Sequence, residues 1–255
     1  MEYERFCNPV FRITFLISGS AQQANCEALW ARFSEAADEA YAIANRRDWH
    51  VDSNDDGVVV KRVYLPTYKR SVILGETILN ISPEDGLYLY WDDGKDIPNW
   101  NPEISYLEDV VEIAPELRVS YQVGSSKLGG LIKPRDFLVL TGWLERNRNY
   151  YVVYTNITNE YRPKPIESHY VRGQNGPSLI AFERVPTDPN KTLFRYLLNV
   201  DMNHGSWFII PRSVYEKATS AAIRDYLQYV RDRTNRVPLF SPPRKSIRPH
   251  HTNLF

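Results

Sequence analysis

The sequence contains only two cysteines, Cys7 and Cys26, among its 255 residues. Both lie near its start, and no Cys-x-x-Cys motif is present. Zinc sites and disulfide-stapled folds need several cysteines, or cysteines and histidines, at short spacings. The scarcity of cysteine therefore argues against a zinc site and a disulfide framework, and it favours a reducing compartment over secretion.

An excess of charge of either sign is also missing. Lys and Arg together number 31, and Asp and Glu together number 31. A field that would draw the whole protein to nucleic acid or to an anionic membrane requires a basic excess. We therefore expect no nucleic-acid partner, and we expect any membrane contact to be local.

The apolar stretch near the N-terminus, residues 10–17, is short and is interrupted by Arg12. A membrane-spanning helix needs about 20 apolar residues. A signal peptide would begin with basic residues, whereas Glu2 and Glu4 are acidic. We expect residues 1–24 to form an N-terminal arm, while a signal segment and the remnant of a membrane-anchored form stay open.

Motifs of several enzyme classes are absent as well. We find no Gly-x-Ser-x-Gly elbow, no His-Glu-x-x-His helix and no phosphate-cradling Gly-x-x-x-x-Gly-Lys loop. His50, His169 and His204 are isolated in the sequence, and His250-His251 lies in a proline-rich tail. We therefore expect no catalytic residue, no metal and no enzymatic activity, with a lipid hydrolase as the remaining enzymatic alternative.

What the sequence does contain is, first, a pattern of helices. Residues 25–47 carry apolar side chains at three- and four-residue steps after Asn25, a good N-cap. Residues 211–233 show a second amphipathic pattern. A shorter helix should follow Ser82, which can cap it, with Pro83 in its first turn, and should end by Gly94.

Strand patterns occupy most of the remaining sequence. Residues 58–64 and 71–81 should form two strands joined by a turn around Pro66. Further strands are predicted at 104–113, 117–123, 136–145, 150–158, 178–185 and 192–201. We interpret these as one antiparallel meander. Since no linker interrupts the pattern, we expect a single domain over residues 25–235, followed by a disordered, proline-rich basic tail at 236–255.

The most distinctive segment spans residues 127–143. Gly129-Gly130 allows backbone angles that a strand cannot hold, and Leu128, Leu131 and Ile132 are apolar although they lie in a predicted surface loop. Pro134 has no N–H and suits the first residue of the strand that follows. Exposed apolar side chains of this kind indicate a binding partner.

Four sets of short motifs occur in order along the chain. They are Trp100-Asn101-Pro102; Pro134-Arg135-Asp136-Phe137; Arg172 with Gly176-Pro177; and Leu198-Asn199-Val200-Asp201 with Gly205 and Pro211. In order and spacing they resemble the StAR-related lipid-transfer (START) domains, most closely the branch of the steroidogenic acute regulatory protein and its late-endosomal relative. The resemblance implies an α+β helix-grip fold, in which a curved antiparallel β-sheet wraps around a long C-terminal α-helix and encloses a lipid cavity.

The same resemblance implies a function. It is non-enzymatic lipid binding and transfer between membranes, most simply of a sterol such as cholesterol, with one lipid enclosed per domain as cargo and no other cofactor. The implied protein is a cytoplasmic monomer that contacts membranes transiently and peripherally. A lipid-sensing regulatory module and a carrier of ceramide or phospholipid are the alternatives.

We expect the glycine-broken loop to act as a gate together with the C-terminal helix. The glycines would flex, the apolar side chains would enter the membrane interface, and the lysines would face lipid phosphates. A static plug over the cavity mouth is the alternative. The predicted gate and membrane residues are Gly124, Lys127, Leu128, Gly129, Gly130, Leu131, Ile132 and Lys133.

The predicted cavity should hold a few polar groups among apolar ones. In the sterol-carrying branch a glutamate and an arginine form a charge pair at the positions that align with Gln122 and Thr141, and a histidine aligns with Asn175. The neutral side chains here could meet a hydroxyl or an amide, or they could simply satisfy each other. The predicted cavity residues are Gln122, Thr141, Asn175, Trp207, Phe208, Val214, Ala218, Ala222 and Tyr226.

The motif Pro134-Arg135-Asp136-Phe137 is expected to be structural. Adjacent residues of a strand point to opposite faces, so Arg135 and Asp136 cannot pair with each other. We expect at least one of the two to anchor the base of the loop through hydrogen bonds.

Overall fold

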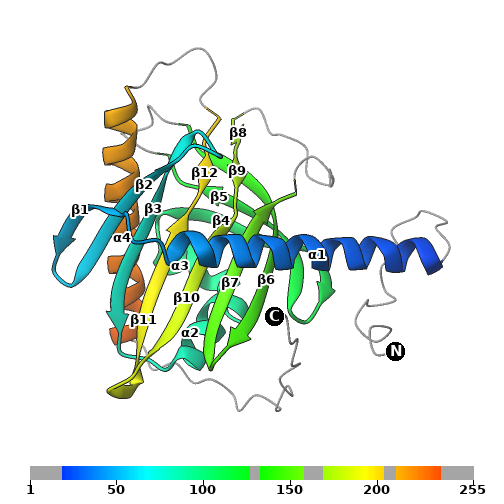
Figure 1. Ribbon diagram of the computed structural model, residues 1–255, viewed down its shortest axis with the longest axis horizontal. Helices are drawn as coiled ribbons and strands as arrows, with labels where there is room; N and C mark the ends of the chain where they lie inside the picture. Colours follow the sequence, from blue (N-terminus) through cyan, green and yellow to red (C-terminus); the bar gives the residue numbers. More distant parts are fainter. Residues whose placement is uncertain (1–18, 127–132, 158–168, 204–210, 237–255) are drawn as a thin grey trace.

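The computed structural model describes residues 19–126, 133–157, 169–203 and 211–236. Helix α1 (Gly19–Ala44) crosses one face of a large sheet, and its first turns project beyond the sheet (Figure 1). The helix begins before the expected Asn25, because Ala21, Gln22 and Gln23 favour a helix and nothing in the sequence stops it there. The expected start of the first helix near Asn25 is therefore wrong.

The main sheet has ten strands in the order β1-β2-β3-β11-β10-β7-β6-β5-β4, with β8 pairing β6 off this path. All pairs are antiparallel except β6 with β8. The strands are β1 (His50–Asp55), β2 (Val58–Leu65), β3 (Arg70–Leu79), β4 (Ile104–Ala114), β5 (Leu117–Gly124), β6 (Arg135–Arg146), β7 (Asn149–Asn156), β8 (Val171–Arg172), β10 (Ser178–Val185) and β11 (Asp188–Leu198). A second, two-stranded sheet pairs β9 (Gln174–Asn175) with β12 (Val200–Asp201).

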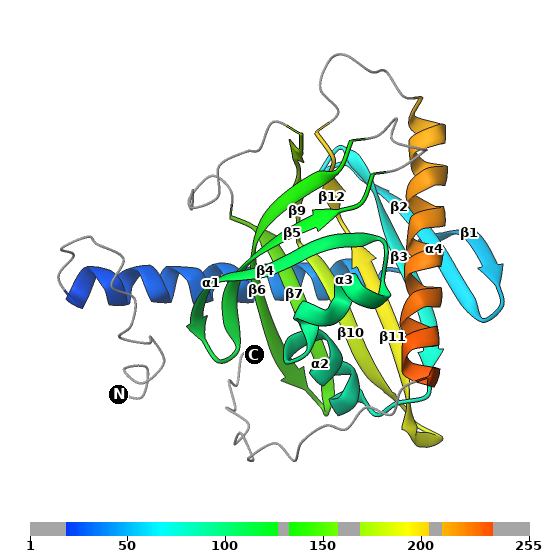
Figure 2. The ribbon, with the colours of Figure 1, turned by 180° about the vertical axis from the view of Figure 1, so that it is seen from behind.

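The antiparallel meander expected from residue 104 onward is confirmed. Strands β4, β5, β6, β7, β10 and β11 are neighbours in chain order, and β11 then pairs with β3 (Figures 1 and 2). The sequence patterns missed β1, which is a polar edge strand, and the two-residue strands β8, β9 and β12. Strands that short or that polar carry little hydrophobic alternation.

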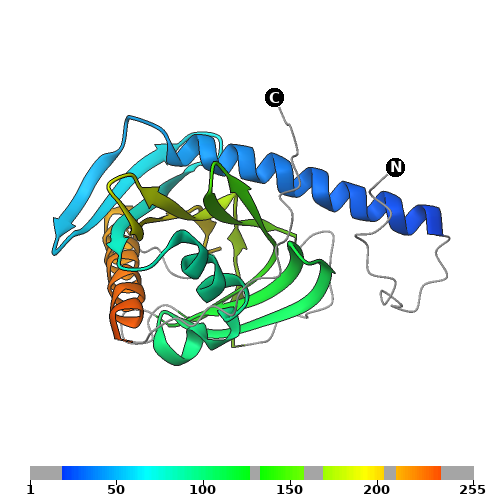
Figure 3. The ribbon, with the colours of Figure 1, turned by 90° about the horizontal axis from the view of Figure 1, so that it is seen from below.

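The short helices lie on the concave face of the sheet. Helix α2 (Pro83–Trp91) begins as expected, because the Ser82 hydroxyl accepts a hydrogen bond from the Asp85 backbone N–H at 3.1 Å. A 3-10 turn, η2 (Gly94–Asp96), and helix α3 (Ile97–Trp100) follow. Figure 3 shows these elements and helix α4 (Arg212–Arg236) inside the curve of the sheet, with α1 across the outside.

Alternation along the strands divides the interior into two main apolar cores. The convex core lies between the sheet and α1 and includes Phe33, Leu138 and Leu179. The concave core lies between the sheet, α2 and α4 and includes Phe182 and Leu227. A curved antiparallel sheet that grips a long C-terminal helix is the α+β helix-grip fold expected from the sequence, which is confirmed.

One expectation about the cysteines is corrected. Cys26 is disulfide-bonded, so the chain does carry a disulfide. Cys7 lies outside the described residues. Among the residues that the structure describes, no helix is both long and apolar enough to span a membrane.

Candidate functional site

The concave face is built by alternate residues of the central strands. On β6, a side chain at Gly142 would meet Phe33 of α1, so this position faces the convex side and its neighbour Thr141 faces the concave side. Register then places Arg118 of β5 opposite Thr141, and Thr141 opposite Tyr154 of β7. We call Arg118, Thr141 and Tyr154 the polar row.

Arg118 is held by an ion pair with Asp109 of β4. The Arg118 Nε atom lies 3.0 Å from Asp109 Oδ1, and Nη1 donates to Asp109 Oδ2 at 3.1 Å. Nη1 also donates to the Trp91 carbonyl oxygen at 3.1 Å, and the guanidinium carbon lies 3.8 Å from the centroid of the Trp91 ring. Burial lowers the pKa of Arg118, and the Asp109 carboxylate opposes this shift. The arginine is thus fixed in position on three sides.

Thr141 contributes a hydroxyl that has no hydrogen-bond partner in the part of the chain that the structure describes. The side chain is 2% exposed, and Oγ1 makes no hydrogen bond. The indole nitrogen of Trp100, on α3, is likewise buried without a partner on the concave side. A buried polar group left unsatisfied costs about 1–3 kcal/mol, so such groups call for an explanation.

Four tyrosines lie close to one another on the concave side of the sheet. Tyr154 and Tyr196 come from the sheet, Tyr90 comes from α2, and Tyr226 comes from α4, with the Tyr196 and Tyr226 rings 4.9 Å apart. Burial raises the pKa of all four hydroxyls. Tyr154 also lies within electrostatic range of Arg118, which opposes the rise in its pKa. The four phenols are therefore held neutral.

Tyr154 and Tyr196 have a further property in common. Protein surrounds them closely enough to raise their pKa values, yet each is only half-buried by accessible surface. Both side chains thus lie in the concave apolar core and keep part of their surface accessible.

Helix α4 is attached to the sheet in two different ways. In its C-terminal half, Ile223 and Leu227 pack so closely on β3 that a side chain at Gly75 would lie 2.6 Å from Ile223. Its N-terminal half is attached through polar groups. Glu216 accepts hydrogen bonds from Arg62 at 2.5 Å and from the Ser71 hydroxyl at 2.5 Å.

In the motif Pro134-Arg135-Asp136-Phe137, the side chains of Arg135 and Asp136 lie on opposite faces of the sheet. Arg135 is 7% exposed, and it donates to the Met202 carbonyl oxygen at 3.1 Å and to the Lys133 carbonyl oxygen. Asp136 is fully buried on the other face, where Oδ2 accepts from Arg172 at 2.7 Å and from the Tyr121 hydroxyl at 3.1 Å. Both residues thus hold the backbone around the start of β6. Pro134 precedes this strand, and Phe137 joins a small apolar cluster with Val139 and Val200.

The other predicted cavity residues are spread over several places. Gln122 is half-buried on the concave face, on the same side of β5 as Arg118. Asn175 is buried, but its Oδ1 already accepts from the Ser178 hydroxyl at 2.7 Å within the turn at Gly176. Tyr226 is buried beside Tyr196, and Ala218 and Ala222 are partly exposed.

Val214 is 44% exposed at the start of α4, so it lies outside the packed interior, contrary to expectation. It falls on the solvent side because α4 turns Glu216 and Ser220 toward the sheet. Trp207 and Phe208 lie outside the described residues, as do residues 127–132 of the predicted gate. Of the gate, Gly124 ends β5 and Lys133 is exposed.

Sequence reasoning missed the Arg118–Asp109 pair and Trp91. A signal was available on β5, since Leu117, Val119, Tyr121 and Val123 pack in the convex core. Strict alternation therefore places Arg118 on the same face as Gln122. No comparable signal pointed to Asp109.

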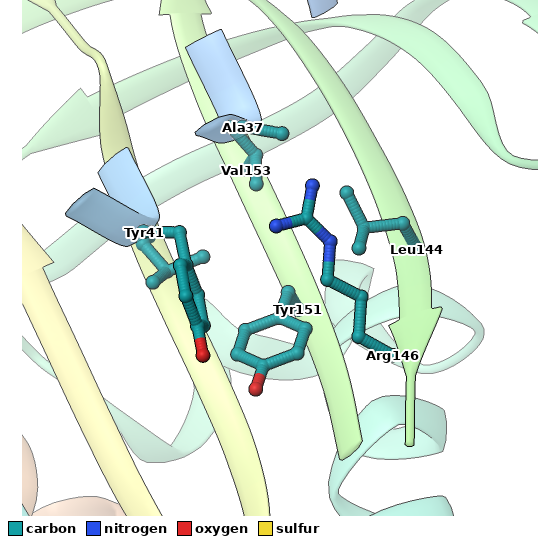
Figure 4. A pocket seen from close by; sticks show the side chains of 7 residues that line it. Ala37, Tyr41, Leu144, Arg146, Tyr151 and Val153 are labelled. Carbon is teal, nitrogen blue, oxygen red and sulfur yellow. The ribbon is translucent and has the colours of Figure 1, made fainter. Parts of the chain in front are cut away.

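A small cleft lies on the opposite side of the sheet. It is a shallow, partly open depression between α1 and strands β6, β7 and β10, with no enclosed volume that could hold a ligand. Figure 4 shows Arg146 and Tyr41 at its edge, where the guanidinium lies 5.4 Å from the ring centroid. Ligand sites usually measure roughly 300–1,000 Å³, so this depression is too small to be one. Among the described residues, no cluster of side chains suits a metal ion.

Comparison with known proteins agrees with this architecture. A family model described as "START domain" matches residues 28–236. The mitochondrial steroidogenic acute regulatory protein of Danio rerio is 26% identical over 142 residues, which are 56% of this chain and 48% of that protein. The Rattus norvegicus protein is 23% identical over 211 residues, covering 80% of this chain and 70% of the relative. The chain spans about half the length of the first curated relatives that it matches.

Solved structures share the fold. The human StAR-related lipid transfer protein 5 superposes with a TM-score of 0.73 at 19% identity, covering 82% of this chain and 97% of that chain. A STAR-related lipid transfer protein from Xanthomonas axonopodis superposes with a TM-score of 0.59 at 16% identity, covering 74% of this chain and 99% of that chain. At these identities the likeness concerns the fold alone.

Proposed function

Because this chain belongs to the START domain family, we propose that it is a non-enzymatic carrier that encloses one lipid and moves it between membranes. START domains bind lipids, and the lipid proposed here is a sterol such as cholesterol. The site is the space between the concave face of the sheet and helix α4. In this proposal the protein acts as a cytoplasmic monomer that touches membranes only transiently.

The observation that carries this proposal is that polar atoms on the concave face are buried without hydrogen-bond partners. Thr141 Oγ1 and Trp100 Nε1 are buried without a partner, and Tyr154 and Tyr196 keep accessible surface although protein surrounds them. A bound lipid with a polar end would satisfy the first pair and cover the second. Both features are then explained by one occupant.

The physical need for such an occupant to be enclosed is large. Burying a lipid of about 25 carbons at roughly 0.8 kcal/mol per methylene corresponds to a transfer free energy on the order of 20 kcal/mol. Free diffusion of the lipid through water is therefore very slow. A carrier must enclose it and then open at a membrane, and we propose that residues 124–133 and α4 form that opening.

The sterol is supported by the chemistry of the inner face and by similarity to the steroidogenic acute regulatory proteins, which are 21–27% identical. Cholesterol has one hydroxyl at one end of an apolar body, which matches a face with few polar groups among many apolar ones. The sterol branch's charge pair is replaced here by Gln122 and Thr141. This replacement makes ceramide the lipid to test beside cholesterol.

The test is to incubate the purified protein with a mixed lipid extract, recover it, and identify the retained lipid by mass spectrometry. We expect one lipid per protein, chemically unchanged, and faster transfer of that lipid between vesicles in the presence of the protein. A chemically altered lipid would indicate an enzyme, and retention without transfer would indicate a lipid sensor. Failure to retain any lipid would refute the proposal.

A further inference from the structure

The side of helix α4 that is buried changes in character along its length. Helix α4 lies alongside β2 and β3 (Figure 2). A stripe of buried side chains runs along it at three- and four-residue steps, and consists of Glu216, Ser220, Ile223, Leu227, Val230 and Thr234. Among the described side chains between residues 214 and 222, the buried ones are both polar. The apolar part of the stripe begins only at Ile223.

The polar groups of this first half converge on Arg62 of β2. Arg62 Nη1 donates to Glu216 of α4 at 2.5 Å, and Arg62 Nε donates to Asp52 of β1 at 3.1 Å. The Ser71 hydroxyl of β3 donates to Glu216 at 2.5 Å, and the Ser220 hydroxyl of α4 donates to Asp52 at 2.6 Å. We call these five residues the latch. It joins α4 to three strands through one guanidinium that lies between two carboxylates.

Asp52 belongs to the latch because of an irregularity in β1. The residues before and after Asp52 pair with Lys61 and Val60 of β2, which are consecutive, so Asp52 is the extra residue of a β-bulge. A bulge redirects the side chain of the extra residue. Here the carboxylate meets both Arg62 and Ser220. The bulge thus connects the edge strand to α4.

The second half of α4 is attached by apolar packing. A side chain at Gly75 of β3 would lie 2.6 Å from Ile223 and 2.9 Å from Leu227, so the helix and the strand are in close contact there. Farther along, Arg231 forms an ion pair with Asp56 in the turn between β1 and β2. The helix is therefore anchored to the sheet at this end independently of the latch.

The two attachments respond differently to solvent. The side chains of Arg62, Asp52 and Glu216 are 29%, 15% and 11% exposed, so ions in solution reach the latch. Dissolved salt screens such partly exposed ion pairs, whereas it does not weaken apolar packing. Ion pairs at a buried interface also hold it less firmly than well-packed apolar side chains often do. The first half of α4 should therefore open at a lower free energy than the second half.

We propose that the latch is an ionic lock on α4. When it is released, the first half of the helix moves away from β2 and β3, while the second half stays packed on Gly75, and a lipid gains access to the concave face. This proposal rests on the lipid-carrier function. It adds to that function the end of α4 that opens and the contacts that hold this end closed.

The first experiment uses Glu216→Gln, which removes the charge but keeps the shape of the side chain and an oxygen that can accept from Ser71. Asp56→Asn is the matched control, because it removes the charge of the Arg231 pair in the second half of α4, and asparagine suits the backbone φ of 49° at this position. Amide hydrogen exchange of the full chain is measured by mass spectrometry. In Glu216→Gln, exchange over residues 214–222 should be about 5- to 10-fold faster than in the wild type, and exchange over residues 224–234 should be unchanged. Asp56→Asn should leave residues 214–222 at the wild-type rate.

The second experiment varies the salt concentration. Raising NaCl from about 0.05 M to about 0.5 M should accelerate exchange over residues 214–222 in the wild type, and it should do so much less in Glu216→Gln, whose ion pair is already lost. A purely structural role of Glu216 would not produce this difference. If Glu216→Gln does not fold, the salt dependence of the wild type decides the question. Wild-type exchange over residues 214–222 that does not respond to salt would overturn the ionic lock.

The third experiment connects the lock to lipid entry. Transfer of cholesterol, ceramide and phosphatidylcholine between uncharged vesicles is followed with the same three proteins. We expect faster transfer by Glu216→Gln than by the wild type, and the wild-type rate for Asp56→Asn. If the wild type transfers none of these lipids, the carrier function fails, and hydrogen exchange alone decides whether the latch holds α4. If the wild type transfers lipid, but Glu216→Gln opens the helix without changing the transfer rate, the carrier function stands and the inference is wrong.

Discussion

The two faces of the sheet treat their buried polar groups differently. On the convex face, Arg195 pairs with Glu76 and donates to the Ala44 carbonyl oxygen at the end of α1, and Asp136 accepts from Arg172 and Tyr121. On the concave face, Thr141 Oγ1 and Trp100 Nε1 have no hydrogen-bond partner among the described residues, and on the convex side the same holds for Asp136 Oδ1 and Trp49 Nε1. The difference is that Arg195 and Asp136 connect separate elements of the fold through their other bonds, whereas Thr141 and Trp100 connect none through these atoms. Mutations on the two faces should therefore separate stability from cargo binding.

The largest effect is expected for Asp136→Ala, which removes the buried carboxylate that forms an ion pair with Arg172. Removing one member of a buried ion pair typically lowers the free energy of unfolding by about 3–5 kcal/mol. Urea denaturation checks this value. Arg118→Met should be less destabilising, because Asp109 keeps 17% exposure and Lys95 nearby. Equal losses for the two variants would contradict the distinction between the faces.

The next effect compares two glycines that face opposite helices. A side chain at Gly142 would lie 2.5 Å from Phe33 of α1 and 2.9 Å from the Glu116 carbonyl oxygen, and one at Gly75 would lie 2.9 Å from Leu227 of α4. Overpacking of this kind costs about 1–3 kcal/mol, so both alanine variants should unfold at lower temperature.

The two glycine variants should differ in lipid exchange. Gly75→Ala displaces α4, which covers the concave face, and should accelerate lipid exchange between vesicles. Gly142→Ala displaces α1 and should leave exchange at the wild-type rate. Faster exchange in Gly142→Ala as well would show that the faces are coupled.

A smaller effect concerns the buried tyrosines of the concave face. Burial raises the pKa of Tyr226 well above its ordinary value of 10.0, so the folded state keeps a proton that the unfolded state loses above about pH 10. The stability from this group is complete below pH 10 and falls as the pH rises further. Above about pH 10 the free energy of unfolding falls as the pH rises, and we expect this fall to be about 1.4 kcal/mol per pH unit smaller in Tyr226→Phe than in the wild type.

Guanidinium unfolding between pH 8 and pH 11, followed together with tyrosine absorbance, measures this slope. Tyr41→Phe is the control, because Tyr41 is 38% exposed on the convex side. An identical slope in wild type and Tyr226→Phe would mean that Tyr226 is not protected from ionisation.

The smallest effect compares two buried threonines. Thr192 donates its hydroxyl to the Ile81 carbonyl oxygen at 2.7 Å, whereas the Thr141 hydroxyl has no partner. Thr192→Val should therefore cost about 1 kcal/mol, and Thr141→Val should change the stability of the lipid-free protein by less than about 0.5 kcal/mol. Thermal unfolding of delipidated protein checks both values, and a clear loss for Thr141→Val would indicate that its hydroxyl is already bonded.

Much of the fold could be predicted from local patterns. The meander from β4 to β11 follows from alternation and turn residues, and the cap at Ser82 follows from its hydroxyl and the proline after it. The start of α1 was misplaced because Asn25 is a good cap residue in a stretch where helix formers continue on both sides. A residue that favours the N-cap position does not start a helix when the residues before it also favour helix.

The site was harder to predict for a specific reason. Thr141 could be chosen from its position relative to a motif, but Arg118 acquires its role from Asp109, which lies on the neighbouring strand. The pairing of β4 with β5 shifts register between Asp109 and Val111, so simple alternation along β4 does not show which side chains face inward. The ion pair depends on that irregularity and on Trp91 from α2, neither of which local sequence patterns reveal.

The pairing of β3 with β11 has a consequence for how the chain folds. Leu79 lies opposite Thr192, so this pairing joins segments separated by most of the meander, and α4 follows later still in the chain. Contacts of such long range are slow to form because a large loop must close before they are made. During synthesis the hairpin of β2 and β3 therefore keeps an open edge until β11 emerges, and the apolar concave face stays uncovered until α4 is complete. Formation of the β3–β11 pairing should limit the folding rate. The newly made chain should be most prone to aggregation just before this pairing forms.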